Sequence, residues 1–202
     1  MGRRNLGAWS IVLAALAILS GCAAPQTSAT VIRTLYNADQ PGFSNILVIG
    51  VAGDYSTRES FERQMVMELS RMGVTATAYF TVVGRSPQFT RAYIHDAIRS
   101  RGFDALVFTR QKGQEQQELA PLRPVGTAFD LFGYDYSELN RDVRIRESQA
   151  ITFVTEVYDT MTQLKVWSIE TLSTEVTTLD ALITEQALTI ADQLQEDGLL
   201  DR

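Results

Sequence analysis

Residues 45–51, with the sequence Asn-Ile-Leu-Val-Ile-Gly-Val, constrain the fold of this 202-residue chain more than any other segment. A short, continuous apolar run of this kind is typical of a strand covered on both faces of its sheet. A polar turn follows, and Ser56 with Glu59 predicts a capping box for a helix that runs to about Met72. A buried strand followed by an amphipathic helix indicates an α/β domain.

The next segments repeat this pattern. Residues 74–82 predict a second strand, residues 86–101 a helix, and residues 103–109 a third strand parallel to the first two. The buried stripe of that helix is expected to comprise Phe89, Tyr93, Ile94, Ala97 and Ile98.

The last part of the chain predicts a hairpin and a helix. Residues 148–158 and 164–171 alternate as two strands around a short turn, and the apolar spacing of residues 179–194, Leu188 included, predicts an amphipathic helix. We therefore predict one α/β domain over residues 45–198. It should contain a mixed five-stranded sheet, in the order β-α-β-α-β-β-β-α, with helices packed against it.

The N-terminal segment predicts export from the cytoplasm. Arg3 and Arg4 precede an apolar run, residues 11–19, that is shorter than the roughly 20 apolar residues of a membrane-spanning helix. The segment Leu19-Ser20-Gly21-Cys22 resembles the lipobox of bacterial lipoproteins. That resemblance implies a diacylglyceryl group on Cys22 and cleavage just before it. The alternative is an ordinary signal peptide, or an uncleaved anchor, in which the cysteine occurs by chance.

These features divide the chain into three parts. We expect a lipoprotein signal peptide at residues 1–21 and a flexible tether at residues 22–44, with a short extended stretch at 31–36. The α/β domain then faces the periplasm. Ala23 is not the aspartate that would suggest retention in the inner membrane, which favours the outer membrane.

Composition excludes several classes of function. Cys22 is the only cysteine and His95 the only histidine, so an internal disulfide, a cysteine zinc site and a histidine metal cluster are ruled out. The leader removes two of the 18 Lys and Arg residues, which leaves 16 against 24 Asp and Glu, a net charge near -8. An acidic body is poorly suited to nucleic acid, and no cofactor is expected.

Two segments resemble a family of bacterial envelope lipoproteins. The family includes the lipoproteins that activate penicillin-binding proteins and the periplasmic part of the curli-secretion lipoprotein. The first segment is the strand at 46–51 with the following helix, which contains Arg58 and Glu62. The second is the hairpin at 157–168, in which Asp159 would open the turn and Trp167 would pack on the sheet. The resemblance implies a non-enzymatic domain that binds protein.

Residues 110–147 have the most unusual composition. Aromatic side chains gather between glycines there, and exposed aromatics suit a protein interface; they could equally be buried against the sheet. Arg144 and Arg146, which follow Arg141, share one strand face and either meet carboxylates of a partner or guard a solvated edge. The candidate partner-binding residues are Phe129, Phe132, Tyr134, Tyr136, Arg144 and Arg146.

No catalytic residues are predicted. The turn Gly50–Asp54 follows the first parallel strand, where open α/β sheets bind ligands, but it lacks the glycines and the lysine of a phosphate-binding loop. His95 is expected on the polar surface of its helix. We therefore predict a lipid-anchored, non-catalytic module that recruits an envelope protein through residues 119–146. The alternatives are a small-ligand or hydrolytic site at Gly50–Asp54 and a structural subunit of an envelope complex.

Overall fold

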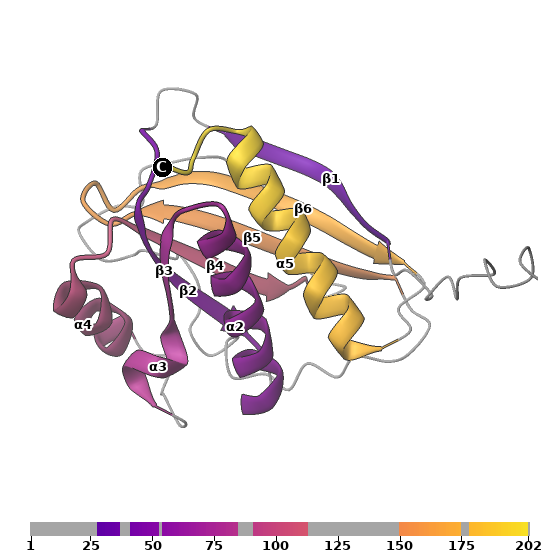
Figure 1. Ribbon diagram of the computed structural model, residues 1–202, viewed down its shortest axis with the longest axis horizontal. Helices are drawn as coiled ribbons and strands as arrows, with labels where there is room; N and C mark the ends of the chain where they lie inside the picture. Colours follow the sequence, from indigo (N-terminus) through magenta and orange to yellow (C-terminus); the bar gives the residue numbers. More distant parts are fainter. Residues whose placement is uncertain are drawn as a thin grey trace, which may run out of the picture.

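The protein folds as one mixed sheet with helices on both faces (Figure 1). The computed structural model describes residues 28–36, 41–52, 54–84, 91–112, 150–174 and 178–201. The strand order is β1-β6-β5-β4-β2-β3. The predicted α/β class and mixed sheet are confirmed, but the sheet has six strands where five were expected.

The parallel half of the sheet is centred on β2 (Asn45–Val51). It pairs on one side with β3 (Thr75–Ala78) and on the other with β4 (Ala105–Gln111), both in parallel. Residues 46–50 are buried, as the continuous apolar run predicted. The three parallel strands expected from the sequence are therefore present, with the first of them in the middle.

The antiparallel half contains the predicted hairpin and one additional strand. β5 (Ile151–Asp159) pairs with β4 and with β6 (Lys165–Thr174), in both cases antiparallel. β1 (Ser28–Tyr36) then pairs antiparallel with β6 along its whole length. β1 lies in the segment expected to be a flexible tether. The extended stretch expected at 31–36 is part of this strand. Its hydrogen-bonding partner is more than a hundred residues away in sequence, so local composition does not reveal that the stretch joins the sheet.

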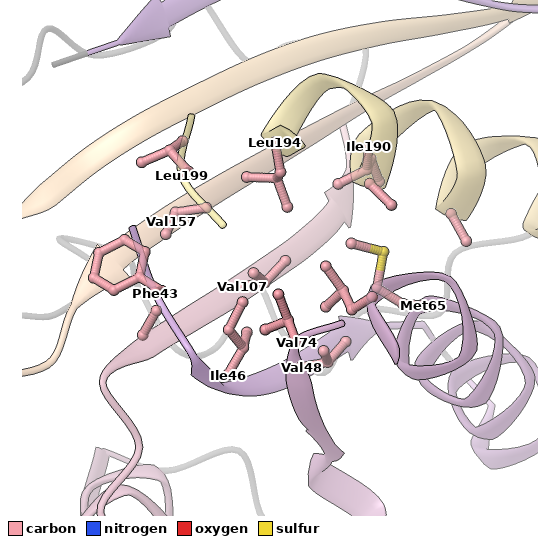
Figure 2. Close-up of a cluster of buried hydrophobic side chains, with 14 of the residues drawn as sticks. Phe43, Ile46, Val48, Met65, Val74, Val107, Val157, Ile190, Leu194 and Leu199 are labelled. Atoms are coloured by element: carbon pink, nitrogen blue, oxygen red, sulfur yellow. The ribbon is translucent and has the colours of Figure 1, made fainter. Parts of the chain in front are cut away.

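One face of the sheet is covered by α2 (Tyr55–Arg71) and α5 (Leu179–Glu196), which also pack on each other. Figure 2 shows the apolar side chains that meet between these two helices and the sheet. Among them are Phe43, Ile46, Val48, Met65, Val74, Val107, Val157, Ile190, Leu194 and Leu199. Phe43 and Leu199 belong to this core although both lie outside the predicted domain limits of 45 and 198.

The other face is covered by α3 (Tyr79–Val83) and α4 (Arg91–Arg101). α3 corrects the prediction that residues 74–82 form a single strand, because the strand ends at Ala78. Tyr79 and Phe80 are both buried. Consecutive side chains of a strand point to opposite faces, so an extended edge strand would expose one of them. A helical turn lets both pack inward.

The buried stripes of two helices are narrower than predicted. Ile94 and Ala97 of α4 are buried, whereas Tyr93 is 50% exposed, and Phe89 lies outside the described residues. In α5 the stripe follows Ile183, Ala187, Ile190 and Leu194, and Leu188 is 44% exposed. Apolar residues beside a buried stripe remain accessible because each of these helices packs along one face only.

Candidate binding site at the carboxyl end of the parallel strands

A small pocket lies where β2 ends, between the first turns of α2 and α5. Its volume is about 50 Å³. Ligand sites for whole small molecules are typically several hundred Å³, so this pocket can hold a single side chain or one end of a ligand. The side chains or backbone that line it belong to Gly50, Val51, Ala52, Thr57, Arg58, Phe61, Thr109, Arg110, Phe153, Leu179, Leu182, Ile183 and Gln186.

Close approach of α2 to β2 shapes one wall of the pocket. A Cβ atom added at Gly50 would lie 2.7 Å from Cδ1 of Phe61, which is shorter than van der Waals contact allows. Glycine is therefore required at this position for the helix to pack so closely on the strand. Of the turn predicted at 50–54, Gly53 lies outside the described residues.

Asp54 is the N-cap residue of α2. The sequence had predicted a capping box formed by Ser56 and Glu59 instead. The Asp54 carboxylate accepts hydrogen bonds from Thr57 N at 2.8 Å, from Thr57 Oγ1 at 2.7 Å and from Ser56 Oγ at 2.6 Å. These hydrogen bonds lower the pKa of Asp54, and the one from the Ser56 side chain has the largest effect. Glu59 instead pairs with Arg63 one turn further on, at 2.6 Å. The N-cap residue of α2 is therefore Asp54, two residues before the predicted cap at Ser56.

Glu62 is fully buried and contacts Gly50, which lines the pocket. One carboxylate oxygen accepts a hydrogen bond from Gly50 N at 3.1 Å, and the other accepts one from Phe80 N at 2.8 Å. Burial raises the pKa of Glu62 to about 7, while the backbone hydrogen bonds and the charge of Arg58 act in the opposite direction. Because both oxygens hold backbone N–H groups, Glu62 links α2 to the end of β2 and the start of α3.

Arg58 lies one helical turn before Glu62 and forms part of the pocket wall. It is only 4% exposed, and its guanidinium lies 5.2 Å from the centre of the Tyr55 ring. The sequence named Arg58 and Glu62 only through the family resemblance. A signal was nevertheless present, because both charges fall on the buried face of α2 that also carries Phe61, Met65 and Leu69.

Hydroxyl and amide groups satisfy one another under the N-terminal half of α5. The Gln186 side chain accepts from Thr171 Oγ1 and donates to Ser173 Oγ, and the hydroxyls of Thr109 and Thr155 are hydrogen-bonded across β4 and β5. This polar seam lies on the sheet face that the pocket opens onto. Of these residues only Thr109 and Gln186 line the pocket, and the surface that the pocket exposes is almost entirely apolar.

The hairpin turn has the features that the resemblance implied for its two key residues. Oδ1 of Asp159 accepts hydrogen bonds from Met161 N at 2.7 Å and Thr162 N at 2.8 Å. Trp167 is fully buried against the sheet, and its Nε1 donates to Asp197 Oδ2 at 2.7 Å. Gln163 has a φ of 59°, a left-handed conformation that glycine adopts more easily.

Other candidate residues are placed only in part. His95 was predicted to lie on the polar surface of its helix, but its side chain is only 17% exposed. Arg99 Nε donates a hydrogen bond to its Nε2 at 2.9 Å. Cys22 and Arg141 lie outside the described residues, as do the partner-binding candidates Phe129, Phe132, Tyr134, Tyr136, Arg144 and Arg146.

In the ranges that the structure describes, no three His, Cys, Asp or Glu side chains are grouped so that they could hold a metal ion. Within the same ranges, no helix is long and apolar enough to cross a bilayer.

Comparisons with known proteins give little more than a distant likeness. No protein-family model and no curated protein matches the chain. Among solved structures, it is similar to the PelC dodecamer from Paraburkholderia phytofirmans at 12% identity and a TM-score of 0.48, over 87% of this chain and 100% of that one. A variant PelC dodecamer from the same organism gives 11% identity and a TM-score of 0.44, over 83% and 98%. Similarity at this level carries no information on activity, partner or assembly.

Proposed function

We propose that this protein is a lipid-anchored envelope lipoprotein whose α/β domain acts as a non-catalytic binding or scaffold module in the periplasm. The anchor is the lipid on Cys22, and the outer membrane is the expected location. The observation that carries the proposal is the order of features at the N-terminus: positive charge, a short apolar run, and then Leu19-Ser20-Gly21-Cys22.

Physical chemistry supports a covalent anchor. The mature domain is acidic, so anionic headgroups repel it and its charge cannot hold it at a membrane. Two or more acyl chains attach a protein firmly, whereas one chain gives only marginal binding. Lipid on Cys22 therefore accounts for membrane attachment without a basic patch.

The use of buried charge supports a non-catalytic domain. A general base or nucleophile needs an accessible side-chain atom beside the reacting group. Glu62, the buried carboxylate nearest the pocket, holds backbone N–H groups with both oxygens. Asp54 is exposed, but its carboxylate is held by the Ser56 hydroxyl and by the backbone N–H and hydroxyl of Thr57 in the first turn of α2. These acids stabilise the fold at the position where a catalytic group would be expected.

Replacing Cys22 tests the anchor. In cells fed a palmitate analogue, the wild-type protein should become labelled and should remain in the washed membrane fraction. Cys22→Ser should remain unlabelled, and the lipoprotein pathway should not process it. Ser20→Ala, which keeps a small residue before the cleavage site, is the matched control and should behave as wild type. Normal processing and equally strong membrane retention of Cys22→Ser would contradict the proposal.

Partner binding through residues 119–146 remains a prediction from sequence. Affinity capture from solubilised envelopes should recover a stoichiometric protein, and replacing Phe129, Phe132, Tyr134 and Tyr136 by serine should abolish that recovery. Tyr93→Ser removes an aromatic side chain that is 50% exposed on α4 and serves as control. Equal recovery with all variants would count against this segment as the binding surface.

The pocket favours one alternative, a site for the apolar end of a small ligand. Ala52 lines the pocket, so Ala52→Leu should fill it, while Ala150→Leu adds the same bulk at an exposed position. Thermal unfolding can be followed with a panel of short-chain amphiphiles. A compound that raises the Tm of wild type and Ala150→Leu but not of Ala52→Leu would favour this alternative, and equal shifts in all three would remove it.

A further inference from the structure

The distance between the lipid and the folded domain is set by where β1 begins. β1 starts at Ser28, and only five residues separate it from Cys22. Six residue steps in a fully extended chain span at most about 21 Å. This upper limit holds whatever conformation residues 23–27 adopt. A lipidated Cys22 therefore holds the start of β1 within about 21 Å of the bilayer surface.

The start of β1 is a fixed point on the domain. Ser28 is paired with Thr174, the last residue of β6, and the pairing continues to Tyr36 opposite Trp167. The backbone N–H of Ala29 is hydrogen-bonded to the Glu185 side chain of α5. Pairing along a nine-residue strand fixes the start of β1 at one place on the domain. A short connection to a paired strand limits how the body can face the membrane.

Several elements share this end of the molecule. In Figure 1 the start of β1, the end of β6 and the start of α5 lie together toward the right of the view. β2 and β4 run in parallel, and the pocket at their carboxyl ends also includes Leu179, the first residue of α5. Leu179 is 38% exposed. The pocket is therefore on the same end of the body as the attachment point.

The turn between β5 and β6 lies at the opposite end. β6 has ten residues, which corresponds to a length of about 33 Å. Met161, at the tip of the turn, is 86% exposed. Thr174 and Met161 are thus separated by at least the length of a strand, and they give two reporter positions on opposite ends of the sheet.

We propose that the lipidated protein is oriented on the phospholipid bilayer so that the end of the domain at which β1 begins faces the membrane. The pocket and the first turns of α2 and α5 then face the headgroups, and the β5–β6 turn points away from the membrane. This inference rests on the proposed lipid anchor. Charges at the membrane-facing end are of both signs: Asp54 and Asp180 are exposed, while Arg110 and Lys112 lie at the end of β4. Lys112 is paired with Glu170 at 2.7 Å.

Spin labels at the two ends test the orientation. Thr174→Cys and Met161→Cys each add one free thiol, because lipid occupies the thiol of Cys22. The lipidated full-length protein is reconstituted in vesicles of phosphatidylethanolamine and phosphatidylglycerol that contain a gadolinium-chelating headgroup lipid. Relaxation enhancement falls with the inverse sixth power of distance, so a separation of about 33 Å should make the enhancement at position 174 at least about tenfold greater than at position 161.

Two controls separate the orientation from the anchor. A Gly-Ser insertion of about 20 residues between Cys22 and Ser28 lengthens the connection and should reduce the difference between the labels. The chain from Ala23 onward, made with neither leader nor lipid, should not bind the vesicles. Equal enhancement at both labels, while this unlipidated chain stays in solution, overturns the orientation alone. Binding of the unlipidated chain as strong as that of the lipidated protein overturns the proposed function.

Discussion

The two ends of the parallel strands use the same interaction in different surroundings. At the amino end, the partly buried carboxylate of Asp104 accepts hydrogen bonds from Ser44 N, Ser44 Oγ and Asn45 N, at 2.8 to 3.0 Å. At the carboxyl end, Glu62 accepts from Gly50 N and Phe80 N while fully buried. The carboxylate at the carboxyl end is the one whose pKa burial raises to about 7. We therefore expect the carboxyl end to give stability a dependence on pH near neutrality.

The largest expected effect is the pH dependence caused by Glu62. In the folded protein Glu62 takes up a proton below about pH 7, whereas in the unfolded chain it does so only near its ordinary value of 4.5. Between these values the folded state binds more protons, so the free energy of unfolding falls as pH rises. The loss from pH 5 to pH 8 should be on the order of 3 kcal/mol. Denaturant unfolding at several pH values measures it.

Glu62→Gln is the control for that measurement. The amide cannot titrate, and it places an N–H group opposite one of the two backbone donors. The variant should therefore be less stable than wild type at pH 5, by about 1–3 kcal/mol, and should lose most of the slope. A wild-type stability that is flat across this pH range, or a slope that persists in Glu62→Gln, would refute the role assigned to burial.

At the amino end, Asp104→Ala should have the next largest effect. The substitution leaves the N–H groups of Ser44 and Asn45 without their acceptor, which should lower the free energy of unfolding by about 2 kcal/mol. Asp104→Asn retains one acceptor oxygen and should cost less. In urea denaturation at one pH, the free energy of unfolding should decrease in the order wild type, Asp104→Asn, Asp104→Ala. Equal stability of wild type and Asp104→Ala would show that the amino end does not depend on this carboxylate.

The smallest effect is expected in the turn beside that end. Gln163→Gly relieves a φ of 59° at a residue with a side chain and should raise the free energy of unfolding by up to about 1 kcal/mol. Thr162→Gly, at the preceding position of the same turn, is the matched control and should bring no gain. Thermal unfolding can resolve both changes. If Gln163→Gly is destabilising, side-chain contacts of Gln163 outweigh its backbone strain.

Much of the architecture could be predicted because it depends on local periodicity. The continuous run in β2, the helical spacing in α2 and α5, and the alternation of β5 and β6 each predicted the correct element. The candidate site was predicted less well. Its position after β2 followed from the general behaviour of parallel sheets, but the link that Glu62 makes to β2 and α3 depends on how α2 lies over the strand.

By itself, the sequence determined the α/β class, the order of most elements and the expectation of a lipid on Cys22, because these depend on periodicity and on a short motif. Only the tertiary structure decided that residues 28–36 join the sheet as β1, and that Tyr79 begins a helix. In both cases the deciding hydrogen bonds come from segments that are distant in sequence, β6 for β1 and Glu62 for the amide of Phe80. Non-local partners override local preference when they satisfy backbone groups that would otherwise be buried unpaired.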